Sequence, residues 1–129
     1  MTLSIGIICG GRSGEHEVSL QSAWGIYRAL ERARFAPVLV AIDPEGVWRA
    51  GPAEALLRDP GDPARIRIDR SAEPVIAAPS IHGAGGRARL LARDSLREVA
   101  SVDAFFPIVH GTDGEDGAPG VEVGGARGK

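Results

Sequence analysis

The stretch that decides the fold is LSIGIICGGRSGEHEVSL, residues 3–20. Its first part, residues 3–9, is almost entirely apolar and shows no alternation of apolar and polar side chains. Strands with that pattern are covered on both faces, which is typical of parallel sheets. Glycines and charged residues follow at once, and a helical pattern begins after them. A buried strand that runs through a glycine turn into a helix predicts the first half of a βαβ unit.

The residues that follow complete this unit. After the turn, apolar side chains recur every three or four positions and predict one buried helix face, made of Leu20, Trp24, Tyr27 and Leu30. Residues 37–42 (PVLVAI) predict a second buried strand, and residues 47–49 predict a short returning strand. We therefore expect an α/β fold, built on an open, mostly parallel sheet with helices on both faces.

The middle of the chain gives weaker patterns. Residues 51–59 predict a short helix, and residues 74–78 predict a strand. Residues 81–91 predict a hairpin or loop before another short strand. The pattern becomes clear again at residues 102–109 (VDAFFPIV), an apolar strand that runs directly into His110.

Glycine-rich loops follow two of the predicted strands, at residues 10–14 and 111–117. Ligands of open α/β sheets bind in the crevice beyond the carboxyl ends of the strands. We therefore expect both loops at the functional edge of the sheet.

Composition excludes several classes of function. The 129 residues are 43% hydrophobic and 25% charged, with a net charge of −2. We therefore expect neither a nucleic acid nor a membrane as a partner, because no basic surface is indicated and no apolar run could span a bilayer. The single cysteine, Cys9, cannot form an internal disulfide, which favours a cytoplasmic location. Because it ends an apolar strand, we expect Cys9 to be a buried filler rather than a reactive thiol.

The first glycine loop, residues 10–17 (GGRSGEHE), has neither the GxGxxG of dinucleotide sites nor the Lys-Ser/Thr pair of a Walker loop. Its glycines allow a tight turn and a close approach of the backbone to a ligand. Glu15 and Glu17 favour a cation, such as a substrate ammonium group, over a phosphate. Alternatively, both acids only stabilise the positive end of the helix dipole. We expect helix-capping or surface roles for Ser13, Ser19 and Ser22, and a surface role for His16.

The second glycine loop, residues 110–117 (HGTDGEDG), begins with a histidine where a strand ends. An imidazole there can bind a substrate carboxylate or transfer a proton, or alternatively it only bonds to neighbouring backbone. Asp113, Glu115 and Asp116 lack the alternating spacing of a calcium-binding loop, so we predict no metal site in this chain. We expect Glu115 and Asp116 to brace backbone N–H groups of the two glycine loops instead.

The motifs GGRSGEHEVSL at residues 10–20 and FPIVHGTDGEDG at residues 106–117 together resemble the N-terminal domain of the D-alanine–D-alanine ligases. The resemblance covers residues 3–117 and implies a Rossmann-like, pre-ATP-grasp domain of an ATP-grasp enzyme. In that family, ATP phosphorylates the carboxylate of one D-alanine and the amine of a second attacks the acyl phosphate. The product is the dipeptide of cell-wall peptidoglycan. The implied cofactors are ATP and Mg²⁺ or Mn²⁺, and the full-length enzyme is expected to be a homodimer.

The resemblance also implies roles for individual residues. Glu15 falls on the acid that helps to hold the ammonium group of the first D-alanine, and it is the catalytic residue we expect in this chain. Val18 falls where a side chain lines the pocket for the methyl group, and His110 lies near the carboxylate of the same substrate. The residues expected to shape the two loops are Gly10, Gly11, Ser13, Gly111, Gly114, Glu115, Asp116 and Gly117.

The sequence departs from the family pattern after Gly117. The family continues with a small residue, an aliphatic residue and Gln-Gly-Leu, whereas this chain continues APGVEV. If the codons from Ala118 onward are GCT CCA GGG GTT GAA GTT GGC, the frame one base later reads Leu-Gln-Gly-Leu-Lys-Leu. We therefore expect residues 1–117 to be the N-terminal domain and residues 118–129 to be an aberrant, frame-shifted tail, with the central and C-terminal ATP-grasp domains absent. Such a chain is not expected to ligate by itself.

Two other functions stay open at this point. One is a stand-alone, non-catalytic α/β binding module derived from the same domain. Against it, residues 118–129 show no apolar periodicity that could cover the sheet edge. The other is a nucleotide- or sugar-binding enzyme of related fold, which the two acids in the first loop and the missing phosphate-binding motif disfavour.

Overall fold

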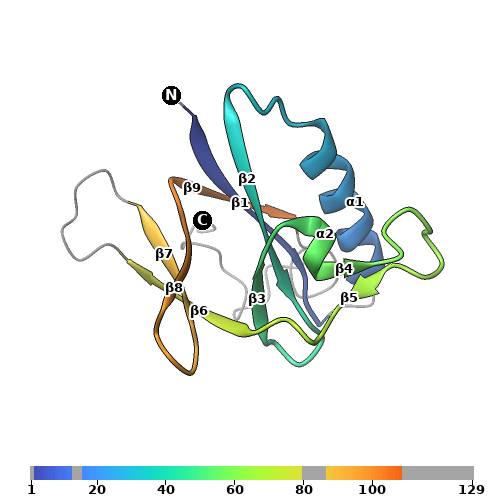
Figure 1. Cartoon of the computed structure of the whole chain (residues 1–129). Coiled ribbons are helices and arrows are strands. Elements are labelled where there is room, and N and C mark those ends of the chain that lie inside the picture. The colour runs from blue at the N-terminus through green and yellow to red at the C-terminus, as the bar shows by residue number, and fades with distance from the viewer. Residues whose placement is uncertain (1, 13–15, 80–86, 109–129) are drawn as a thin grey trace, which may run out of the picture.

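The computed structural model describes residues 2–12, 16–79 and 87–108. Its elements, in chain order, are β1 (Leu3–Gly10), α1 (His16–Ala29), β2 (Phe35–Ile42), β3 (Trp48–Gly51), α2 (Ala53–Leu56), β4 (Leu57–Arg58), β5 (Arg67–Ile68), β6 (Pro74–Pro79), β7 (Ala88–Ala92), β8 (Glu98–Val102) and β9 (Ala104–Ile108). Seven strands form one sheet in the order β8-β7-β6-β3-β2-β1-β9, and β4 pairs with β5 in a separate small sheet (Figure 1).

The predicted βαβ unit is confirmed. Strands β1 and β2 pair in parallel and α1 connects them. Strand β9 pairs in parallel with the other side of β1. The carboxyl ends of these three strands therefore lie at one edge of the sheet, as the glycine loops in the sequence predicted.

The α/β class is confirmed, but the prediction of a mostly parallel sheet with helices on both faces is wrong beyond this unit. Strands β3, β6, β7 and β8 pair antiparallel with their neighbours. The connections at residues 43–47 and 93–97 are too short for parallel strands, which need a crossover of roughly a dozen residues or more. In the part of the chain that the structure describes, both helices pack against one and the same core cluster.

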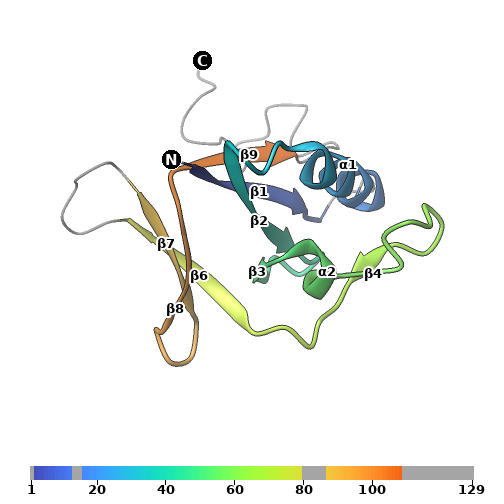
Figure 2. The same cartoon turned by 45° about the horizontal axis from the view of Figure 1, so that its top comes forward.

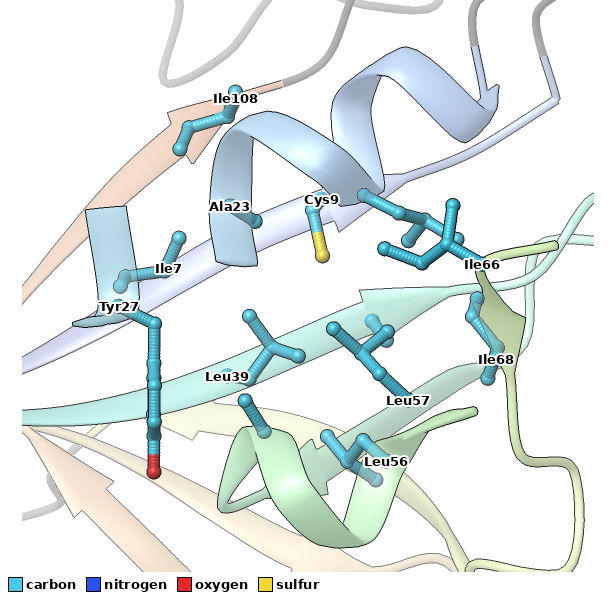
Figure 3. Packing of buried hydrophobic residues seen from close by; sticks show 13 residues of the cluster. Ile7, Cys9, Ala23, Tyr27, Leu39, Leu56, Leu57, Ile66, Ile68 and Ile108 are labelled. Carbon is cyan, nitrogen blue, oxygen red and sulfur yellow. The ribbon is translucent and has the colours of Figure 1, made fainter. Parts of the chain in front are cut away.

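Helices α1 and α2 cover one face of the sheet. The predicted face of α1 is confirmed, because Leu20 and Tyr27 are buried and Trp24 and Leu30 are partly buried against the core. Figure 3 shows Cys9 of β1 among the aliphatic side chains that fill this core. Each large aliphatic side chain buried there contributes about 1.5–3 kcal/mol to the free energy of unfolding.

The other face of the sheet is covered by the sheet itself. Val40 of β2, Val75 of β6, Leu90 of β7 and Val102 of β8 form a second buried cluster. Strand β8 contacts β1 although four strands separate them in the sheet order, so the sheet curls around this cluster. In Figures 1 and 2 the ribbon of β6, β7 and β8 lies on one side of β1 and β2, and the helices lie on the other.

The elements in the middle of the chain agree only in part with those predicted from the sequence. The predicted helix within residues 51–59 is only four residues long, and the chain then enters β4. Strand β6 confirms the strand predicted at residues 74–78. Within the described ranges, no helix combines the length and the apolar character needed to cross a bilayer.

The strand predicted at residues 102–109 is divided by a bend at Asp103. Val102 ends β8, and β9 begins at Ala104 on the opposite edge of the sheet. The Asp103 backbone N–H donates to the Ser4 carbonyl at 2.7 Å, and the Ser4 N–H donates to Asp103 Oδ2 at 2.8 Å. Arg87 Nη1 donates to the other carboxylate oxygen at 2.7 Å. This bend carries the chain from one sheet edge to the other.

Candidate functional site

The candidate site lies at the sheet edge where β1, β2 and β9 end. In the parallel registers, Gly10 lies opposite Ile42, and Cys9 lies opposite Ile108. The two strands that lead into the glycine loops therefore end side by side. This juxtaposition was predicted from the apolar strands and the glycines that follow them.

Two glycines turn the chain away from the end of β1. Gly10 and Gly11 have φ angles of 90° and 100°, which glycine adopts more readily than any other residue. A Cβ atom on Gly10 would collide with the carbonyl oxygen of Ile42, whereas a Cβ atom on Gly11 would meet nothing within 4 Å. The Gly11 N–H donates to that same Ile42 carbonyl at 2.7 Å. Of these two glycines, Gly10 is therefore required for two reasons, its backbone conformation and the lack of space for a side chain, whereas Gly11 is required only for the first.

Ser19 joins the ends of β1 and β9. Its side chain is completely buried, and its Oγ accepts a hydrogen bond from the Gly10 N–H at 2.9 Å. The same hydroxyl donates to the carbonyl oxygen of Ile108. The prediction of a capping or surface role for Ser19 is therefore wrong.

His16 is also buried, which contradicts the surface role predicted for it. Its Nδ1 lies 2.7 Å from the Gly11 carbonyl oxygen, so Nδ1 carries the proton and donates it. The helical period offered a signal for both residues. His16 and Ser19 fall on the same side of α1 as the buried Leu20 and Ala23.

Val18 lies in the first turn of α1 with 44% of its surface exposed. Its neighbour Ser19 points into the core, so Val18 presents its methyl groups to solvent next to the ends of the strands. An exposed apolar side chain in this place is available to contact a small ligand.

The other predicted site residues lie outside the described residues. These are Ser13, Glu15, His110, Gly111, Gly114, Glu115, Asp116 and Gly117. Among residues 2–12, 16–79 and 87–108, no three His, Cys, Asp or Glu side chains are grouped so that they could hold a metal ion.

Asp43 follows the end of β2, and its carboxylate accepts hydrogen bonds from residues that are close to it in the sequence. Its Oδ1 accepts from the backbone N–H groups of Glu45 and Val47 at 2.9 and 3.1 Å, and its Oδ2 accepts from Arg49 at 2.7 Å. Burial alone would raise the pKa of Asp43, but the hydrogen bonds from Val47, Arg49 and Glu45 together outweigh it and lower the pKa. Asp43 is thus an ionised residue whose bonds serve the turn between β2 and β3.

Cys9 directly precedes Gly10 and Gly11, the two residues of the glycine turn. It is completely buried, and burial raises the pKa of its thiol to about 12. A thiol with that pKa stays protonated at neutral pH, so it is a poor nucleophile. The predicted role of Cys9 as a buried filler is confirmed.

Comparison with known proteins agrees with this geometry. A family described as "D-ala D-ala ligase N-terminus" matches residues 4–119. D-alanine–D-alanine ligase A of Salmonella typhimurium is 43% identical over 116 residues, which are 90% of this chain and 31% of that protein. The corresponding ligase of Escherichia coli (strain K12) is 42% identical over the same length.

Solved structures of such ligases have the same fold. The D-alanine-D-alanine ligase from Coxiella burnetii superposes with a TM-score of 0.65 at 33% sequence identity, covering 91% of this chain and 31% of that one. The VanG D-Ala:D-Ser ligase from Enterococcus faecalis gives a TM-score of 0.60 at 28% identity, covering 92% of this chain and 32% of that one. The chain thus spans about a third of the length of these relatives. Since the family match runs through both strands that end at the candidate site, the chain belongs to the family of D-alanine–D-alanine ligase N-terminal domains.

Proposed function

We propose that this domain binds the first D-alanine of a D-alanine–D-alanine ligase. The observation that carries this proposal is the side-by-side ending of β1 and β9, with Cys9 opposite Ile108. Each strand leads into one of the two loops that carry the family motifs. A small amino acid held between them would be reached by groups from both loops.

Three side chains account for the three groups of D-alanine. We assign the ammonium group to the carboxylate of Glu15, and the carboxylate group to the imidazole of His110. We assign the methyl group to Val18, which the exposed position of its side chain supports. The turn at Gly10 and Gly11 lets the backbone approach the ligand closely.

The proposed reaction takes place in two steps. The carboxylate of the first D-alanine accepts the terminal phosphoryl group of ATP, which gives an acyl phosphate and ADP. The amine of the second D-alanine then attacks the acyl carbon, loses a proton and releases phosphate, so that one amide bond has formed. We propose that the complete enzyme is cytoplasmic and homodimeric, and that its dipeptide enters cell-wall peptidoglycan.

ATP and Mg²⁺ supply the transferred phosphoryl group and the neutralisation of its charge. The described residues do not fit Mg²⁺, because no suitable group of acidic or histidine side chains occurs among them. We therefore assign both cofactors to the central and C-terminal domains of the family. The part assigned to this domain is to bind and orient the first D-alanine.

A hybrid enzyme tests the proposal. Residues 1–117 would replace the corresponding segment of the Salmonella typhimurium ligase, which is 43% identical to this chain over 116 residues. We expect the hybrid to ligate D-alanine. In it, Glu15→Gln should lower kcat/KM for the first D-alanine about 10- to 100-fold, because one charge-assisted contact contributes about 1.5–3 kcal/mol.

Glu17→Gln is the matched control, because Glu17 is an exposed acid in the first turn of α1. Equal losses for Glu15→Gln and Glu17→Gln would contradict the role assigned to Glu15. The 129-residue chain by itself should convert no ATP to ADP with D-alanine present. A hybrid without ligase activity, together with a 129-residue chain that binds another small molecule, would instead support a stand-alone binding module.

A further inference from the structure

We infer that Ser19 is a positioning residue for the proposed D-alanine site, because it fixes the ends of β1 and β9 relative to each other where the chain continues into the two glycine loops. The identity of the substrate rests on the proposed function. The positioning itself rests on the contacts of Ser19 in the described part of the chain.

The hydroxyl group of Ser19 bonds to both strand ends. Ser19 Oγ accepts from the N–H of Gly10, the first residue of the glycine turn. It also donates to the carbonyl of Ile108, the last residue of β9, which is 89 positions away in the sequence. A change in the position of this hydroxyl must therefore affect both strand ends together.

Few side chains could form both of these hydrogen bonds. A hydroxyl donates and accepts through a single atom, which an amide or a carboxylate cannot do. The Ser19 side chain is completely buried, so water cannot replace it without a rearrangement of its surroundings. Alanine would leave the Gly10 N–H and the Ile108 carbonyl without this partner.

Ser19 lies near the start of α1, close to the glycine turn. It follows Val18, whose side chain is exposed at the same helix end. One turn earlier, His16 donates to the Gly11 carbonyl. The start of α1 is thus bonded to both glycines of the turn, and Ser19 extends this link to β9.

The experiment uses the 129-residue chain and compares Ser19→Ala with Leu56→Val. Leu56 is completely buried in α2 within the same core, so its truncation lowers stability without touching the strand ends. Three quantities would be measured by NMR: the hydrogen-exchange rate of the Gly10 amide, the carbonyl carbon shift of Ile108, and the dissociation constant for D-alanine. Conditions are adjusted so that the two variants have equal free energies of unfolding.

For Ser19→Ala we expect at least about tenfold faster exchange at Gly10 and a changed Ile108 carbonyl shift, since a buried hydrogen bond is lost. We also expect D-alanine to bind about tenfold more weakly. In Leu56→Val, all three quantities should stay close to those of the wild type. If the two variants behave alike in exchange and in D-alanine binding, Ser19 is only a structural residue and the inference is overturned.

A second pair of variants covers the case in which Ser19→Ala does not fold. Ser19→Thr and Ser19→Val have nearly the same shape, but only threonine keeps the hydroxyl. Slower exchange at Gly10 and tighter D-alanine binding in Ser19→Thr would support the inference, and equal behaviour of the two would overturn it. If the wild-type chain shows no response to D-alanine at all, the proposed binding by this chain fails, and the Gly10 and Ile108 measurements alone decide the role of Ser19.

Discussion

Gly10 and Gly11 have similar backbone angles but different surroundings, and substitutions can separate the two effects. In Gly11→Ala only the positive φ is unfavourable, so we expect a loss of about 1–2 kcal/mol in the free energy of unfolding. In Gly10→Ala the new methyl group would also collide with the Ile42 carbonyl, which is backbone and cannot move aside easily. We expect a loss of more than about 3 kcal/mol there. Urea unfolding measures both, and equal losses would show that the turn shifts to admit a side chain.

The carboxylate of Asp43 gives a prediction about acid stability. Its pKa is lower in the folded chain than the value of about 3.9 for an unfolded aspartate. The folded state therefore binds fewer protons, and the stabilisation by Asp43 is complete above the unfolded pKa and is lost as the pH falls through the folded pKa. We expect Asp43→Asn to cost about 3 kcal/mol at pH 7, because it removes the partner of the buried Arg49.

The pH dependence separates this effect from a general loss of stability. The difference in unfolding free energy between wild type and Asp43→Asn should shrink as the pH is lowered below about 4. Asp94→Asn is the control, because the Asp94 side chain is 82% exposed and its nearest cation, on Arg93, is 3.9 Å away. It should change stability by less than about 0.5 kcal/mol at every pH. A difference for Asp43→Asn that stays constant down to pH 2 would contradict the lowered pKa.

At the scale of elements, the sequence predicted strands and helices correctly where the apolar pattern continues over many residues. Strands β1 and β2 are continuous apolar runs, and α1 repeats its buried positions over several turns. Strands β4 and β5 are two residues long, too short to show any period. The direction of β6 and β7 could not be predicted either, because a short apolar run does not show whether its neighbours in the sheet are parallel or antiparallel to it.

The candidate site was predictable in its position but not in its internal contacts. The place of the site follows from two apolar strands that each lead into glycines. Ser19 was missed because a polar residue near a helix start is usually a cap or a surface residue. Its partner on β9 is distant in the sequence, so no local pattern reveals the bond.

The bend at Asp103, between β8 and β9, makes a measurable contribution to the stability of the folded chain. Its carboxylate accepts from the Ser4 N–H at the start of β1 and from Arg87 just before β7. Asp103→Ala removes both bonds where β8 passes into β9, and we expect a loss of about 1–3 kcal/mol in the free energy of unfolding. Asp94→Ala, in the loop after β7, should change it by less than about 0.5 kcal/mol. Equal effects of the two substitutions would show that the Asp103 contacts add nothing to stability.

At the scale of the whole molecule, one sheet serves two purposes. Its parallel part, β2-β1-β9, carries the candidate site at its carboxyl edge, and its antiparallel part curls to cover the face that no described helix covers. Among the described strands β9 pairs only with β1, and about half of the surface of its residue Phe106 is exposed. An apolar edge strand of this kind favours association with a further segment of chain.

A shift of the reading frame accounts for the sequence after Gly117. The family match ends at residue 119, close to the point where the sequence stops following the family pattern. We propose a one-base shift near codon 118, and the test is to sequence the gene from codon 105 to well beyond codon 129. We expect that a single-base change restores Leu-Gln-Gly-Leu and opens a frame long enough for the rest of a ligase, of which this chain matches about 31%. If the frame is as printed and no ligase sequence lies downstream, the proposed frame shift is wrong.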